Sequence, residues 1–158
     1  MKLLEIVVKN GILPSLTAVE RNKAIDEIMD ALVEAGAVKA ELRDEFVKSI
    51  IKREKRGSTG FGHGVAVPHV KHPAIDKMTV AIGISQQGVE FNSLDQQPVY
   101  SIFLLLSPED KPEDHLDAME VIFGNLSQET FRRFLRQATT VEEILTLLEE
   151  ADAGALTR

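Results

Sequence analysis

The sequence contains no cysteine and no tryptophan among its 158 residues, and it has a single tyrosine. Without thiols the chain can form neither a disulfide nor a cysteine-ligated zinc or iron–sulfur site, and it has no thiol nucleophile. The lack of disulfides fits a reducing, cytoplasmic environment. Because large aromatic rings are so few, we expect no extended surface on which bases or sugar rings stack.

The sequence also lacks a hydrophobic run long enough to cross a membrane, which takes about 20 apolar residues. The longest conspicuous run, at residues 102–106, reads IFLLL. The N-terminus carries an acid at position 5 and no small-residue cleavage pattern, so it does not resemble a signal peptide. We therefore expect a soluble cytoplasmic protein that does not span a membrane.

Acidic side chains outnumber basic ones by 25 to 18, which gives a net charge of −7. The segment 107–158 accounts for all of this charge, and the rest of the chain is neutral overall. An acidic chain is a poor nucleic-acid binder, because that affinity depends on neutralising phosphates. We expect no nucleic-acid partner. The exception to the acidity is a compact basic cluster of Lys52, Arg53, Lys55 and Arg56.

The length is that of one ordinary domain, and no composition shift marks a linker, so we expect residues 1–158 to form a single domain. Apolar periodicity predicts helices at 19–35, 41–55, 116–126, 129–137 and 141–150. Apolar and β-branched runs predict strands at 6–12, 65–67, 79–84 and 99–106, with a hairpin or short edge strand within 86–91. This order predicts one α/β or α+β sandwich.

A glycine-rich segment in the middle of the chain has the character of a loop that can approach an anion. Four of the eight residues from Gly57 to Gly64 are glycine, so the backbone N–H groups are not shielded by side chains. Immediately afterwards, Pro68 stiffens an extended segment that presents His69 at a strand end. An imidazole, backbone donors and the guanidinium of Arg53 or Arg56 are the groups needed to handle a phosphoryl group.

Other interpretations of this region remain open from the residues alone. The loop does not end in Gly-Lys-Ser/Thr and precedes a strand, so it is neither a P-loop nor a dinucleotide fingerprint. His63, His69 and His72, with Asp76, are candidate metal ligands, although their spacing matches no standard zinc motif. Ser58 lacks the context of a hydrolase nucleophile. Surface histidines without a function are the simplest alternative.

Two motifs resemble a known family. The segment Arg53–His69, REKRGSTGFGHGVAVPH, is similar to the active-site motif of enzyme IIA domains of the fructose/mannitol type (type 2) in the bacterial phosphoenolpyruvate-dependent phosphotransferase system. The GSTG at 57–60 resembles the nitrogen-regulatory branch. The segment Pro112–Leu116, PEDHL, resembles the second histidine motif of the family, which opens a helix. The resemblance covers nearly the whole chain and implies a mixed β-sheet flanked by helices on both faces.

The resemblance implies a histidine phosphocarrier, which is a phosphotransferase that forms a phosphohistidine intermediate. His69 matches the phosphoacceptor, and His115 matches the second histidine, which hydrogen-bonds the phosphoryl group or orients His69. Arg53 matches the arginine that offsets phosphoryl charge. No cofactor and no metal are implied. The implied phosphoryl-binding loop consists of Gly57, Ser58, Thr59, Gly60, Gly62, His63 and Gly64.

The implied donor is HPr or its nitrogen-branch relative, and the implied acceptor is a set of regulated target proteins or a IIB domain. Docking requires apolar surface around the site, to which Phe61 contributes unless it is a core anchor. His63 stands where many relatives carry asparagine, and His72 is expected to be a turn residue. A sugar-specific IIA component for fructose or mannitol uptake, a non-phosphorylated binding module and a metal-binding protein are the alternatives. The oligomeric state is left open.

Overall fold

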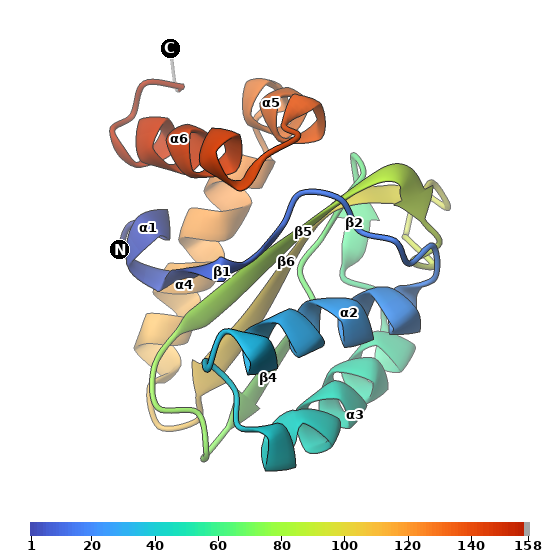
Figure 1. The fold of residues 1–158 in the computed structure, drawn as a ribbon, viewed down its shortest axis with the longest axis vertical. Coiled ribbons are helices and arrows are strands. Elements are labelled where there is room, and N and C mark those ends of the chain that lie inside the picture. Colours follow the sequence, from blue (N-terminus) through green and yellow to red (C-terminus); the bar gives the residue numbers. More distant parts are fainter. Residues whose placement is uncertain (157–158) are drawn as a thin grey trace.

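The computed structural model describes residues 1–156, in which a mixed six-stranded sheet is covered by helices on both faces (Figure 1). The strands are β1 (Val7–Leu13), β2 (Gly60–Gly62), β3 (Val65–Ala66), β4 (His69–His72), β5 (Thr79–Val89) and β6 (Val99–Pro108). The helices of the described part are α1 (Leu3–Ile6), α2 (Arg21–Glu34), α3 (Ala40–Arg56), α4 (Pro112–Leu126), α5 (Glu129–Gln137) and α6 (Val141–Asp152). Within residues 1–156, no helix is both long enough and apolar enough to cross a membrane.

The sheet is organised around β6, which is antiparallel to β5 and parallel to both β3 and β4. Strand β1 extends the sheet beyond β5, and β2 extends it beyond β3. Successive side chains of a strand point to opposite faces, and a strand in the middle of a sheet is therefore apolar on both. Leu104 and Leu106 join the core under α2 and α3, whereas Phe103 and Leu105 join the core under α4, α5 and α6. This explains the unbroken apolar run at residues 102–106.

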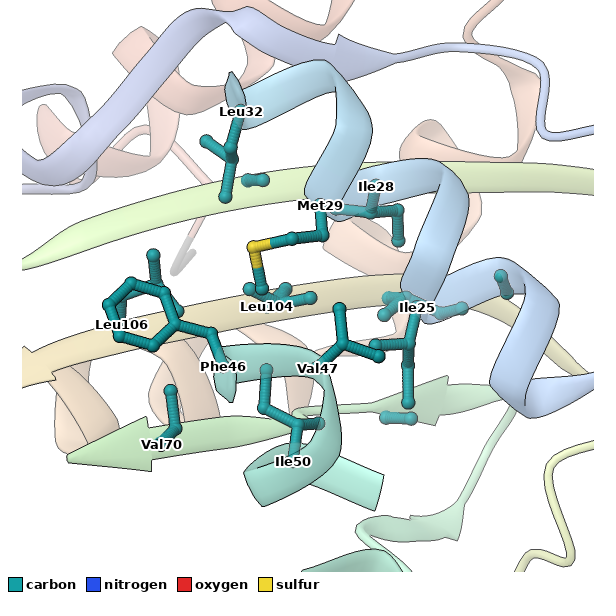
Figure 2. Close-up of a cluster of buried hydrophobic side chains, with 14 of the residues drawn as sticks. Ile25, Ile28, Met29, Leu32, Phe46, Val47, Ile50, Val70, Leu104 and Leu106 are labelled. Carbon is teal, nitrogen blue, oxygen red and sulfur yellow. The ribbon is translucent and has the colours of Figure 1, made fainter. Parts of the chain in front are cut away.

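The first core lies between the sheet and the helix pair α2 and α3 (Figure 2). Both helices bury the apolar stripe from which they were predicted. The bounds of each helix agree with the predicted range to within two residues. Full burial of such a side chain contributes about 1.5–3 kcal/mol relative to exposure. The labelled members of this core are Ile25, Ile28, Met29, Leu32, Phe46, Val47, Ile50, Val70, Leu104 and Leu106.

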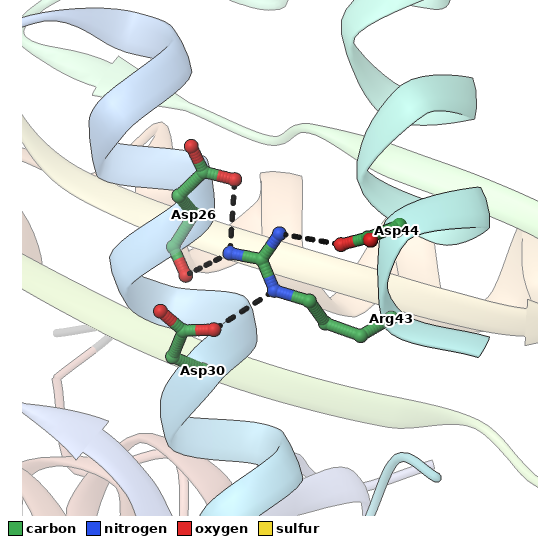
Figure 3. A network of polar contacts seen from close by, with 4 residues as sticks. All are labelled: Asp26, Asp30, Arg43 and Asp44. Carbon is green, nitrogen blue, oxygen red and sulfur yellow. Dashed lines mark hydrogen bonds and ion pairs between the residues drawn. The ribbon is translucent and has the colours of Figure 1, made fainter. Parts of the chain in front are cut away.

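A network of charges also joins the same two helices (Figure 3). The guanidinium of Arg43 on α3 donates to carboxylates of Asp26 (3.0 Å) and Asp30 (2.8 Å) on α2, and to that of Asp44 (3.0 Å). Hydrogen bonds to Asp30 and Asp44 and the negative charge around them raise the pKa of Arg43. The network links the first turn of α3 to α2, and the last turn of α3 belongs to the candidate site.

Strands β3 and β4 continue each other along the same edge of β6. Val65 and Ala66 pair with residues 101 and 102, and His69 and Val70 pair with residues 105 and 106, so the register is unchanged. The ladder is interrupted at Pro68, which has no N–H to donate, although its carbonyl still accepts from the N–H of Leu105 (2.9 Å). His69 therefore begins a strand directly after the interruption.

The mixed sheet with helices on both faces is as predicted, and five details differ. His69 was expected at the end of a strand, but it begins β4, which was not predicted. The segment 86–91 is not a separate strand, because β5 runs on through Val89, which pairs with Val99. The glycine-rich segment 57–64 is not all loop, since it contains β2. The connection between the predicted strand at 99–106 and the predicted helix at 116–126 is shorter than expected, because β6 ends at Pro108 and α4 begins at Pro112. Helix α1 was not predicted; four residues are too few to show a period.

Candidate active site

Two histidines from different elements face each other beside the edge of the sheet. His69 is the first residue of β4, and His115 lies in the first turn of α4. The centroids of their rings are 5.7 Å apart, and the ring planes are inclined by 51°. His69 is half-buried and His115 is buried. The structure therefore brings together the two histidines that the motifs singled out, although 46 positions separate them in the sequence.

The tautomer of His69 follows from its hydrogen bond. Its Nδ1 lies 2.8 Å from the carbonyl oxygen of Val67, which can only accept, so the ring proton is on Nδ1. Burial, reinforced by the positive charges of Arg53 and Lys71, holds the pKa of His69 below its usual value, although the bond to Val67 and the charge of Glu54 act in the opposite direction. At neutral pH the Nε2 of His69 consequently carries a free electron pair.

His115 is oriented by a buried hydroxyl that sequence reasoning did not single out. The Oγ of Ser107, near the end of β6, lies 2.6 Å from the Nδ1 of His115. Burial, followed by the positive charge of Lys71, lowers the pKa of His115 to about 4, so its ring is neutral at pH 7. When the Ser107 hydroxyl donates to Nδ1, the ring proton of His115 lies on Nε2. The sequence feature that could have pointed to Ser107 is its position as a polar residue directly after the apolar run of β6.

His69 lies in a hollow of about 460 Å³ whose lining is strongly basic. The last turns of α3 provide Lys52, Arg53 and Arg56, and Lys71 comes from β4. The Nη1 of Arg53 donates to the carbonyl of Gly57 (2.8 Å), one of the groups that the end of α3 leaves without a helical partner. This bond anchors the Arg53 guanidinium beside His69. The hollow is suited to a small, multiply charged anion.

The glycine-rich segment is held against α3 by Glu54, a buried acid among the bases of the last helical turn. One carboxylate oxygen accepts from the N–H of Thr59 (3.0 Å), and the other accepts from the Thr59 hydroxyl (2.6 Å). The Oγ of Ser58 accepts from the N–H of Gly60 (3.0 Å) and donates to the carbonyl of Phe91 (3.2 Å). The N–H groups of Thr59 and Gly60 are therefore bonded within the protein.

The other half of the predicted phosphoryl-binding loop turns away from His69. Gly62, His63 and Gly64 all have positive φ angles, of 123°, 59° and 74°. They form the tight connection from β2 to β3, in which the carbonyl of Gly64 accepts from the N–H of Tyr100 (2.8 Å). The exposed His63 lines a different hollow, beside α5. The structure therefore brings together His69, His115, Arg53 and Gly57 and places His63 elsewhere.

The histidines do not converge in the way that the metal interpretation requires. Throughout residues 1–156, no group of three or more His, Asp or Glu side chains could hold a metal ion. His72 is the last residue of β4; its Nε2 contacts a carboxylate oxygen of Glu45, and its Nδ1 accepts from the N–H of Ala74 (2.9 Å). His72 was expected to be a turn residue, but it ends β4, and its bond to Ala74 lies across the turn that follows.

Apolar side chains are exposed along the side of α4. Leu116 follows His115 directly and is 66% exposed. Seven residues further, on the same side of the helix, the ring of Phe123 packs against that of Phe61 with centroids 4.8 Å apart. Phe61 is itself 36% exposed, so it is partly exposed rather than a core anchor. An apolar strip of Leu116, Phe123 and Phe61 thus extends from the histidine pair.

The fold places the chain among phosphotransfer proteins. The crystal structure of nitrogen regulatory protein IIA-Ntr from Neisseria meningitidis is similar to it, with a TM-score of 0.82 and 29% identity over 91% of this chain and 97% of the other. The curated nitrogen regulatory protein of Bradyrhizobium diazoefficiens is 30% identical over 98% of this chain and 99% of its own length. The fructose-specific EIIABC component of Bacillus subtilis is 32% identical over 96% of this chain, which spans only 24% of that relative.

The family is shown by a model that matches nearly the whole chain. Residues 5–151 match the EIIA 2 family of the phosphoenolpyruvate-dependent sugar phosphotransferase system. The chain belongs to this family, and it is a phosphoryl carrier of the type 2 EIIA class with nitrogen-regulatory and fructose-specific relatives. The resemblance that its histidine motifs carry is thereby confirmed.

Proposed function

We propose that residues 1–158 act as one IIA domain that accepts a phosphoryl group on the Nε2 of His69 from an HPr-type phosphocarrier. The observation that carries this assignment is the bond from the His69 Nδ1–H to the carbonyl of Val67, which leaves Nε2 as the nucleophilic nitrogen. Burial keeps that ring neutral, and the hollow around it presents basic side chains to an incoming anion. The phosphoryl carrier role of the family requires the same combination.

The transfer is a reversible exchange between two imidazoles. The Nε2 electron pair of His69 attacks phosphorus while the bond from phosphorus to the donor's imidazole nitrogen breaks, and the electron pair of the broken bond returns to the donor ring. The proton of His69 stays on Nδ1, which donates to the carbonyl of Val67 throughout. Arg53, Arg56 and Lys71 offset the charge of the phosphoryl oxygens. His115, with its proton on Nε2, donates to one of those oxygens.

We further propose a regulatory role, in which the phosphorylation state of His69 decides which target proteins bind. The support is the similarity to nitrogen regulatory proteins over nearly their whole length. The second candidate is transfer of the phosphoryl group to a IIB domain for sugar uptake, which the fructose-specific relatives favour. Incubation of the phosphorylated protein with a panel of IIB domains separates the two roles, because only the transport role predicts transfer.

The test is an intact-mass assay with phosphoenolpyruvate, enzyme I and HPr or its nitrogen-branch relative. We expect one acid-labile, base-stable phosphoryl group on the parent and none on His69→Ala. The matched control is His63→Asn, because His63 lies in the other hollow and asparagine tolerates its left-handed backbone; it should be labelled like the parent. A parent without label would make the chain a non-phosphorylated binding module, and a labelled His69→Ala would place the phosphoryl group on another residue.

A further inference from the structure

Helix α5 carries the second concentration of positive charge in the molecule. Arg132, Arg133 and Arg136 fall within about 100° of the helix circumference, because successive residues are 100° apart. Together with His63 from the turn between β2 and β3, they line a hollow of about 460 Å³. We call it the α5 arginine hollow. Its full lining is His63, Glu129, Arg132, Arg133, Arg136 and Gln137.

Two of the guanidinium groups are held in place by neutral partners. The Nη1 of Arg132 donates to the carbonyl of Leu126, the last residue of α4 (2.8 Å). The Cζ of Arg136 lies over the Tyr100 ring, 3.7 Å from its centroid, which is a cation–π contact. Neither contact neutralises charge, and each leaves further N–H groups free to bind a ligand. Two of the three guanidinium groups are therefore positioned before any ligand arrives.

The charge of these arginines is not balanced within the described part of the chain. Arg43 is bonded to three aspartates, but none of Arg132, Arg133 and Arg136 forms an ion pair with a carboxylate of residues 1–156. Glu129 is the one acid that lines the hollow within those residues. In a chain with 25 acidic side chains, three neighbouring arginines without carboxylate partners are a cost to folding that a bound anion would relieve.

The α5 arginine hollow is separate from the hollow of His69. Helix α4 lies between them, with His115 in its first turn and Leu126 at its end. Eleven residues at 1.5 Å each put these two positions roughly 16 Å apart along the helix axis. Among residues 1–156, none lines both hollows. A ligand in the α5 arginine hollow therefore leaves His69 accessible.

We propose that the α5 arginine hollow binds a small oligophosphate, meaning a molecule with two or more linked phosphate groups. A guanidinium matches a phosphate with two parallel hydrogen bonds, and arginine is favoured over lysine wherever that geometry matters. The hollow has the volume of a small-molecule site. Its lining is charged rather than apolar, so recognition falls on the phosphates. A single phosphate engages one or two of the arginines, whereas linked phosphates reach all three.

The test is titration calorimetry of the whole chain with pyrophosphate and tripolyphosphate at low ionic strength. We expect saturable binding that weakens as potassium chloride is added. Arg133→Gln with Arg136→Gln should weaken binding about 100-fold, since one charge-assisted hydrogen-bonding partner is worth about tenfold. If this double variant does not fold, the single variant Arg133→Gln, at an exposed position, should weaken binding about tenfold.

The matched control is Arg21→Gln, because Arg21, the first residue of α2, lines neither hollow. It should bind tripolyphosphate within about twofold of the parent affinity, as should the parent after phosphorylation. Three results would overturn the proposal. These are no saturable binding to the parent, a loss in Arg21→Gln as large as in the double variant, or citrate binding as tightly as tripolyphosphate. None of these results bears on whether His69 is phosphorylated, so the two proposals fail independently.

Discussion

His69 and His115 are neutral for the same reason but hold their protons differently. Both rings are desolvated, which disfavours the charged imidazolium. A carbonyl fixes the proton of His69 on Nδ1, and the Ser107 hydroxyl allows that of His115 to lie on Nε2. One ring thereby presents an electron pair and the other presents an N–H. A phosphoryl group between the two rings needs both groups, because the electron pair of His69 attacks phosphorus and the N–H of His115 stabilises a phosphoryl oxygen.

The low pKa of His115 predicts a pH-dependent stability. In the unfolded chain this ring binds a proton as the pH falls below about 6.5, but in the folded protein it does so only near pH 4. Its contribution to stability is thus complete above about pH 6.5 and is lost progressively down to pH 4. Between pH 7 and pH 5 the parent should lose about 2 kcal/mol of unfolding free energy that His115→Gln does not lose.

Urea unfolding of both proteins at pH 7, 6 and 5 measures this difference. Titrating groups outside the pair of His69 and His115 are common to the two proteins and cancel in the comparison. Parallel curves of unfolding free energy against pH would contradict the assignment of His115 as a buried neutral ring.

At the scale of the element, the end of α3 and the segment that follows it act as one unit. Arg53 binds the carbonyl of Gly57, and Glu54 binds both polar groups of Thr59. Gly60 then lies so close to Ser93 that a Cβ at this position would be 2.5 Å from the Ser93 Oγ. The segment is therefore a fixed connection that sets the place of Arg53 relative to His69.

Removing Glu54 should loosen that connection. Glu54→Ala leaves the buried N–H and hydroxyl of Thr59 without partners, at a cost of about 2–4 kcal/mol in unfolding free energy. We also expect slower labelling of His69 by phosphoramidate, a small donor that needs no protein docking. Glu54→Gln retains an acceptor for the Thr59 N–H and should recover most of both losses. Urea unfolding and intact mass measure the two effects.

The control for this pair is Glu41→Ala, an exposed acid in the first turn of the same helix, which should cost less than about 1 kcal/mol. If Glu54→Ala were as stable and as readily labelled as this control, Glu54 would have no positioning role.

How well the sequence predicts the structure differs from one element to another. Helices α2 to α6 bury a regular apolar stripe, and their existence follows from spacing alone. The location of His63 does not, because it depends on a turn of three positive-φ residues and on how α5 packs across it. Ser107 and Glu54 were likewise not predicted as positioning residues. Each acts through a contact with a residue of another segment, which no local pattern encodes.

At the scale of the whole molecule, the net charge is −7, but basic and apolar side chains gather at separate places on the surface. The hollow of His69 is basic, and beside it runs the apolar strip of Leu116, Phe123 and Phe61. An anionic phosphoryl group and an apolar docking partner are thus received at neighbouring places. A large exposed apolar side chain next to charged groups is typical of a surface that meets another protein.

This arrangement predicts that docking and chemistry can be separated by one substitution. Leu116→Asp puts a charge into the apolar strip near the N-terminal end of α4, where an acid suits the helix dipole, so stability should change by less than about 1 kcal/mol. We expect the KM for the phosphorylated carrier protein to rise about tenfold or more, because a buried unpaired charge opposes association. The rate with phosphoramidate should stay within twofold of the parent rate, since the hollow of His69 is untouched. Val19→Asp, at an exposed apolar residue just before α2, is the matched control and should change neither. An unchanged KM in Leu116→Asp would move the docking surface off α4, and an equal loss with both donors would show that Leu116 shapes the hollow of His69 itself.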